Sequence, residues 1–346
     1  MKNYIYLILV LFVMVDVHAQ PTLQDTLNAL SHEHTPVFSG SGDESIVCYK
    51  STHRDFFFCI TGLIVAIALI LFKLFFFNRR MNRILREQNV LIEEKNKNIT
   101  DSINYAKRLQ NAILPSVDHI DGILSEYFIL YQPKDIVSGD FYWVSEHGSK
   151  IIVAAVDCTG HGVPGALLSI VGHNALYQTV NELGIVEPAK VLATMDSIIR
   201  KMLHQGEYNA IKDGMDMALC VFDKESKFLE YAGANNPLYI VSESKLSIIK
   251  ASKLTVGTIQ EQLNRPENQS VQLKKGDSFY LFSDGFADQF GGADNKKFKS
   301  RCLQDLILSL SDKSMKEQRS SIFETFKNWK GRNEQVDDVL VIGIRV

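Results

Sequence analysis

One apolar segment restricts what this chain can be more than any other feature. The 22 residues from Phe56 to Phe77 carry a single charge, at Lys73. At about 1.5 Å per residue, a helix of this length crosses the hydrocarbon core of a bilayer. A buried core helix is the alternative, but nothing near the run offers matching apolar partners. Four arginines follow it closely: Arg79, Arg80, Arg83 and Arg86. The sequence therefore predicts a transmembrane helix over 56–77, with the chain beyond it in the cytoplasm.

The sequence before this helix has the pattern of a targeting signal followed by a short extracytoplasmic segment. Lys2 precedes an apolar run, and small or modest side chains follow before Gln20. This pattern predicts a signal peptide over residues 1–19, with an uncleaved anchor as the alternative. Residues 20–55 are then extracytoplasmic, and they are too few to bury a stable core alone. We expect no independent sensor domain there.

A helical connector is predicted between the membrane and the rest of the chain, over residues 78–114. It lacks Pro and Gly, and an apolar residue recurs every seventh position from Leu85 to Ile113. If these are d positions, three of the five a positions are asparagine, which favours a weak parallel dimer. We expect a homodimeric coiled coil that passes a signal to the domain beyond. The alternative is a lone amphipathic helix lying on that domain.

Residues 115–346 have the pattern of one α+β domain. Short β-rich runs dominate: 128–131, 141–144, 151–156, 217–222, 228–231, 238–241, 279–282 and 339–346. Turn residues at 147–148, 223–226 and 275–276 indicate hairpins and therefore largely antiparallel sheets. Helical periodicity is found at 164–183, 188–203, 303–310 and 315–329. The economical arrangement is sheets flanked by helices. The net charge of −3 gives no reason to expect a nucleic-acid partner.

Acidic residues lie at the ends of several predicted strands. Asp140 precedes one strand, Asp157 and Asp284 each follow one, and the pair Asp337 and Asp338 precedes the last. Acids that are buried together repel one another and lose their hydration, and divalent cations relieve both costs. Oxygen ligands favour Mg²⁺ or Mn²⁺ over Zn²⁺. Any one of these acids alone is as well explained as a turn residue.

A glycine-rich turn follows Asp157 and leads into a helix. The stretch DCTGHGVPGA places Gly160 and Gly162 where the backbone must approach an ion or a phosphate closely. His161 within it could contact phosphate or a water on a metal, or it could simply stabilise the turn. The unit as a whole is typical of a site built at a strand end.

Five ordered blocks carry a family resemblance: SGDFYW, VDCTGHGVPGALLS, YAGANNP, SDGFADQFGG and VDDVLVIGI. They resemble the SpoIIE-type branch of the metal-dependent (PPM) serine/threonine protein phosphatases. The resemblance implies an αββα sandwich with two central antiparallel sheets flanked by helices. It also implies two Mn²⁺ or Mg²⁺ ions held by these ligands: Asp140, Asp157, the Cys158 carbonyl, Asp284 and Asp337. Asp338 occupies a position that is often Asn in relatives.

The resemblance further implies what the protein does. Two cations would activate a water for attack on a phosphoserine ester. By analogy, the substrate would be an anti-sigma-factor antagonist of the STAS type, and the protein would belong to the inner membrane of a bacterium. Ala234 and Leu340 depart from the pattern of relatives, so a catalytically silent phosphoprotein-binding module is one alternative. A nucleotide-binding, kinase-like ATPase is the other.

Overall fold

The computed structural model describes residues 44–203, 213–258 and 265–346, with backbone only for residues 44–53. The predicted signal peptide and most of the predicted outer segment therefore lie outside the described residues. The chain divides into two units, residues 1–89 and 90–346. Helix α3 (Glu44–Ile113) begins in the first unit and ends in the second, two residues before Pro115. Within the described residues, α3 is the one helix long and apolar enough to cross a membrane.

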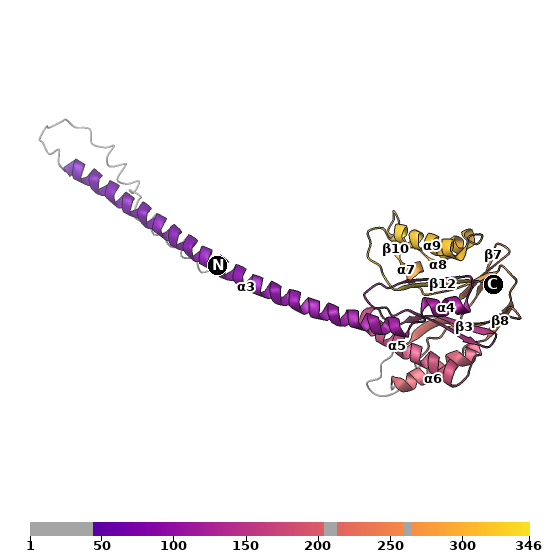
Figure 1. The fold of residues 1–346 in the computed structure, drawn as a ribbon. Coiled ribbons are helices and arrows are strands. Elements are labelled where there is room, and N and C mark those ends of the chain that lie inside the picture. The colour runs from indigo at the N-terminus through magenta and orange to yellow at the C-terminus, as the bar shows by residue number, and fades with distance from the viewer. Residues whose placement is uncertain (1–43, 204–212, 259–264) are drawn as a thin grey trace. The chain divides into compact units, whose positions relative to one another are not determined.

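The second unit is built on two five-stranded antiparallel sheets (Figure 1). The first has the strand order β1 (Tyr127–Gln132), β12 (Val339–Arg345), β9 (Ser278–Phe282), β6 (Leu238–Ser242) and β7 (Lys245–Ile249). The second has the order β2 (Phe141–His147), β3 (Lys150–Cys158), β4 (Met215–Asp223), β5 (Phe228–Ala234) and β8 (Gln269–Gln272). A small ribbon pairs β10 (Phe290–Gly291) with β11 (Lys296–Lys297).

Helices cover the outer faces of both sheets. One set consists of α5 (Gly162–Tyr177), which continues into the π-helical turn η1 (Gln178–Glu182), and α6 (Pro188–Met202). The other consists of α7 (Gly285–Asp288), α8 (Ser300–Ser309) and α9 (Met315–Lys330). In Figure 1, α5 and α6 lie on one side of the two sheets, and α8 and α9 lie on the other. The predicted αββα sandwich is confirmed.

The alternation of side chains along β3 explains the layered core. Ile151, Val153 and Ala155 point between the two sheets, where they join residues of β9 and β12. Their neighbours 152, 154 and 156 point to the other face and pack under α5 and α6. Because successive strand residues face opposite sides, a strand buried on both faces must be apolar throughout. This is why the run IIVAAV shows no polar positions.

A helix and a turn are among the parts of the second unit that differ from the sequence prediction. A short helix α4 (Val117–Ile123) precedes β1, and its Ile120 is buried between the sheets. The turn at Lys275 and Gly276 was predicted as a hairpin, which is wrong. It connects β8 in one sheet to β9 in the other, and neither strand pairs with the other. Turn residues specify a chain reversal but not the strand that will be the next partner.

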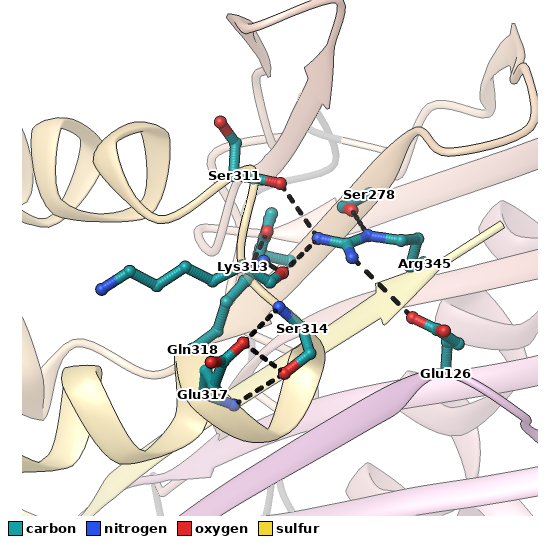
Figure 2. Close-up of polar contacts among 9 residues, drawn as sticks. Glu126, Ser278, Ser311, Lys313, Ser314, Glu317, Gln318 and Arg345 are labelled. Carbon is teal, nitrogen blue, oxygen red and sulfur yellow. Dashed lines mark hydrogen bonds and ion pairs between the residues drawn. The ribbon is translucent and has the colours of Figure 1, made fainter.

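Near the end of the chain, Arg345 ties the last strand to the turn between α8 and α9 (Figure 2). Its Nη2 donates to the carbonyls of Ser311, at 3.0 Å, and Lys313, at 2.7 Å. Its Nε donates to Ser278 Oγ at 3.3 Å, and Glu126 lies 3.8 Å from Nη1. The guanidinium thus binds two carbonyls of this turn, of which that of Lys313 also accepts the Gln318 side chain at 3.1 Å.

We expect Arg345→Ala to lower the free energy of unfolding by about 2 kcal/mol, because charged hydrogen bonds to carbonyls are lost. Lysine should recover little of this, since it cannot reproduce the planar fork. Urea unfolding of the full chain in detergent measures the effect. The control is Arg301→Ala, which removes an exposed ion pair and should change stability by less than about 0.5 kcal/mol. Equal effects of the two variants would contradict this role.

Candidate active site

The acids of the second sheet meet because of strand register. The antiparallel pairing of β2 with β3 places Phe141 opposite Val156, so Asp140 and Asp157 lie at the same end of the two strands. On the other side of β3, Asp216 of β4 is directly opposite Asp157. The three carboxylates therefore lie at the same end of the three neighbouring strands. Asp216 is not among the predicted site residues, although it immediately precedes the predicted strand 217–222.

Ser283 joins the first sheet to this edge. Its hydroxyl donates to Asp140 Oδ2 at 2.5 Å and accepts the Leu340 backbone N–H at 3.0 Å. Asp284 follows it at the N-cap of α7, and Asp337 lies two residues before β12. The two sheets therefore present their acids at a common end, as the positions of these residues beside strand ends predicted.

The adjacent acids Asp337 and Asp338 are differently engaged. Asp338 is buried, and its two oxygens each accept a backbone N–H at 2.7 Å, from Lys134 and from Gly139. These bonds hold the loop that leads to Asp140. Asp337 accepts the Asp338 N–H through one oxygen, at 2.8 Å, and its charge acts on Asp157 and Asp284. Asp338 thus holds the loop and also acts on Asp140, whereas Asp337 acts on Asp157 and Asp284.

Burial and mutual repulsion raise the pKa values of these carboxyl groups. For Asp140, burial raises the pKa well above its usual range, and the neighbouring Asp157 adds to the effect. Burial first, then Asp284 and Asp337, raise the pKa of Asp157 to about 8. Burial and Asp337 raise the pKa of Asp284 to about 6, although Lys297 opposes the shift. The site holds more buried negative charge than its surroundings compensate.

This donor set fits divalent cations. Within the described part of the chain, no three His, Cys, Asp or Glu side chains are already grouped tightly enough to hold a metal ion. The carboxylates are nevertheless close enough to raise one another's pKa, and nearly all the donors are oxygens. Hard cations such as Mg²⁺ and Mn²⁺ take such ligands and would offset the repulsion. The residues present therefore suit the metal that the sequence analysis expects.

The glycine-rich turn contacts the loop that leads to Asp140. A Cβ on Gly139 would lie 2.5 Å from the Gly160 carbonyl and 3.2 Å from that of Cys158, so the two loops touch through their backbones. The Cys158 carbonyl is thus beside the Asp140 loop. Its thiol is buried, and burial raises the pKa of that thiol well above the usual range. A nucleophilic role for this cysteine is therefore disfavoured.

His161 sits at the exposed end of the same turn. Its Nδ1 is 2.7 Å from Asp135 Oδ2, and both side chains are about half exposed. This pairing gives the imidazole a partner within the turn, as the turn-stabilising interpretation expected. Among the described residues, no hydrogen bond joins His161 to the strand-end acids, and Asp135 is its partner.

The end of α3 also contacts the site region. Gln110 is buried, and its Nε2 donates to the Ser138 carbonyl at 2.6 Å and to Ser169 Oγ at 3.0 Å. Its Oε1 accepts the Ser138 N–H at 3.2 Å. If Ile113 is a d position of the predicted coiled coil, Gln110 is the a position three residues before it. In this part of α3, the a position packs against the second unit instead of a second helix.

We expect Gly285→Ala to reduce both activity and stability sharply. A Cβ at this position would lie 1.9 Å from the Asp338 carbonyl, so the segment that carries Asp337 would have to move. Misplacing a ligand by about 1 Å can cost about 10²-fold in rate. The control is Gly122→Ala in α4, where a Cβ meets nothing within 4 Å. Activity assays and thermal unfolding of both variants measure the difference, and similar behaviour of the two would contradict the prediction.

Comparisons with known proteins agree with this geometry. The family profile described as Stage II sporulation protein E (SpoIIE) matches residues 147–346. The SiaA-PP2C domain of Pseudomonas aeruginosa is 33% identical, with a TM-score of 0.67 over 72% of this chain and 98% of that domain. The PP2C phosphatase domain of SpoIIE from Bacillus subtilis, with a regulatory fragment, is 22% identical over 64% of this chain and 63% of that one. Its TM-score of 0.53 supports the fold alone.

A curated relative is also detected. The phosphoserine phosphatase RsbU of Bacillus subtilis is 24% identical over 159 residues. The matched region is 45% of this chain and 44% of RsbU, so the chain spans less than half the length of this relative.

Proposed function

The chain belongs to the SpoIIE family, and from that premise we propose that it is a metal-dependent phosphoserine phosphatase. The observation that carries the proposal is the gathering of acids from both sheets at one end of the sandwich. Asp140, Asp157, Asp284 and Asp337 are the proposed carboxylate ligands, and the Cys158 carbonyl completes the set. Asp338 is left out because its oxygens are already engaged by two backbone N–H groups.

Two divalent cations, when bound, would supply an activated water and neutralise charge on the phosphoryl oxygens. The chain's own residues have separate tasks. Ser283 fixes the rotamer of Asp140 and keeps the two sheets together at the site. Asp338 holds the Lys134–Gly139 loop, and Gly139 allows that loop to touch the glycine-rich turn. Burial of the acids excludes water that would otherwise weaken their hold on cations.

The remaining elements extend the proposal to the membrane. The apolar run 56–77 within α3 anchors the protein in the inner membrane, and the arginines that follow it keep the phosphatase domain in the cytoplasm. We place the homodimeric coiled-coil seam in residues 82–99 of α3. Its continuation at Gln110 is buried against the catalytic unit and cannot also face a second helix.

The proposed substrate is a phosphoserine protein. RsbU is named a phosphoserine phosphatase, and the SpoIIE neighbour is named a cell fate determinant. By analogy, an anti-sigma-factor antagonist of the STAS type is the substrate we propose. This step rests on family membership and not on a feature of the site.

The test is phosphate release from a phosphoserine peptide by the full chain in detergent micelles. We expect release with Mn²⁺ or Mg²⁺ and none with EDTA. Binding of Mn²⁺ and of the peptide without any release would instead support a silent binding module. Saturable ATP binding without release would support the kinase-like alternative.

A further inference from the structure

A groove of about 600 Å³ lies beside the proposed metal site, on the side of β6, β7 and the start of α8. Its walls come from three segments of the chain, residues 235–239, 248–254 and 300–304. The lining residues include Asn235, Tyr239, Ile248, Lys250 and Gln304.

Asn235 connects the groove to the acids. Its Nδ2 donates to Asp216 Oδ1 at 3.0 Å and to Thr255 Oγ1 at 3.1 Å, and Thr255 donates to the same Asp216 oxygen at 2.8 Å. Asp216 is the strand partner of Asp157. Asn235 adopts φ +58, a left-handed conformation that Asn tolerates better than most residues. The groove is therefore joined by one hydrogen bond to Asp216, whose charge acts on the proposed ligands Asp157 and Asp284.

The charge of the groove is opposite to that of the site. Lys250 lines it, and Lys299 immediately precedes Ser300, another lining residue. Among the described residues that line the groove, none is acidic. The neighbouring acids would repel a negatively charged side chain, whereas these lysines would attract one. The phosphate of a substrate would therefore bind at the acids through cations, whereas its acidic side chains would bind the lysines directly.

The rest of the groove suits a peptide. Ile248 exposes 44% of its surface there, and Leu254 and Pro237 add apolar area. On the opposite wall, Gln304 Nε2 donates to Tyr239 Oη at 3.0 Å, which fixes both side chains. An open groove with an apolar wall and basic side chains can hold an extended segment that carries both apolar and acidic residues.

We propose that this groove binds the substrate segment next to the phosphoserine and selects segments with acidic side chains. This inference rests on the proposed phosphatase function, because the phosphoserine must reach the acids while its flanking residues occupy the groove. Lys250 is the residue that should matter most, since it is exposed and lies in the wall of the groove. The partner is thereby defined by its chemistry, as an acidic phosphoserine protein.

The test measures peptide affinity by fluorescence anisotropy on the full chain in detergent with Mn²⁺. The probe is a labelled acidic peptide in which a non-hydrolysable phosphonate replaces phosphoserine. Lys250→Glu should raise its dissociation constant about five- to tenfold, because an attractive charge pair becomes repulsive. A second probe with lysines in place of the acidic residues should bind wild type more weakly and bind Lys250→Glu more tightly than wild type.

The matched control is Lys245→Glu. Lys245 is an exposed lysine at the other end of β7, and it does not line the groove. If both glutamate variants bind the acidic probe equally well, the docking proposal is overturned.

Hydrolysis of p-nitrophenyl phosphate, which does not reach the groove, is measured in parallel and should be unchanged in Lys250→Glu. Absence of that hydrolysis in wild type would overturn the phosphatase function, whereas the anisotropy result tests the groove independently.

Discussion

Replacing Asp140 by Asn should abolish Mn²⁺-dependent phosphate release, with a loss of at least about 10³-fold in kcat. Asp140 is 2% exposed and is held by Ser283 at the junction of the two sheets. Asn preserves the size of the side chain but removes the charge that would hold a cation. The loss should persist at saturating Mn²⁺, because a ligand is missing and the remaining acids cannot move to replace it. Steady-state assays across a Mn²⁺ titration measure the effect.

The thermal stability of Asp140→Asn distinguishes a folding defect from the loss of a metal ligand. Removing one of several mutually repelling buried acids should leave the melting temperature of the metal-free Asp140→Asn protein equal to or above that of wild type. The control is Asp294→Asn, at a side chain that is 72% exposed, is paired with Lys296 and is not a proposed ligand. Wild-type activity of Asp140→Asn, with an unchanged Mn²⁺ dependence, would remove Asp140 from the site.

The general architecture could be predicted because each element carries its own signal. The strands buried on both faces, such as β3, are continuous apolar runs, and the hairpin between β2 and β3 has Gly148 in a left-handed conformation. Acids at strand ends could be expected to meet, because in an antiparallel sheet the end of one strand lies beside the start of its neighbour. The edge strands β7 and β8 were missed because their exposed faces are polar and they lack a continuous apolar run.

Long-range pairings could not be read from the residues. Asp216 reaches the site only because β4 pairs with β3 in one register, and a shift of one residue would turn it away. Asp338 looks like a ligand in sequence, but two backbone N–H groups about 200 residues earlier in the chain engage it. Likewise, the heptad pattern of α3 predicts an apolar seam but not what it contacts. The structure brings Gln110 against the catalytic unit.

The metal-free protein should lose stability as the pH rises from about 4 to about 8. An unfolded Asp titrates near pH 3.9, whereas in the folded protein the pKa of Asp157 is about 8 and that of Asp284 about 6. Between these values the folded state binds more protons than the unfolded state, so the free energy of unfolding falls with increasing pH. In EDTA, the melting temperature of the full chain should be several degrees lower at pH 8.5 than at pH 5.

Mn²⁺ should reverse this trend. Cations bind the deprotonated carboxylates, so their stabilising effect must grow as the pH rises through the same window. At about 100 times the dissociation constant, binding contributes about 2.7 kcal/mol, which for a domain of this size raises the melting temperature by about 5–10 °C. We expect that increase at pH 8.5 and almost none at pH 5. In Asp157→Asn, both the pH dependence without metal and the Mn²⁺ effect should be much smaller. A wild-type melting temperature that does not respond to Mn²⁺ at pH 8.5 would mean that these acids do not form a cation site.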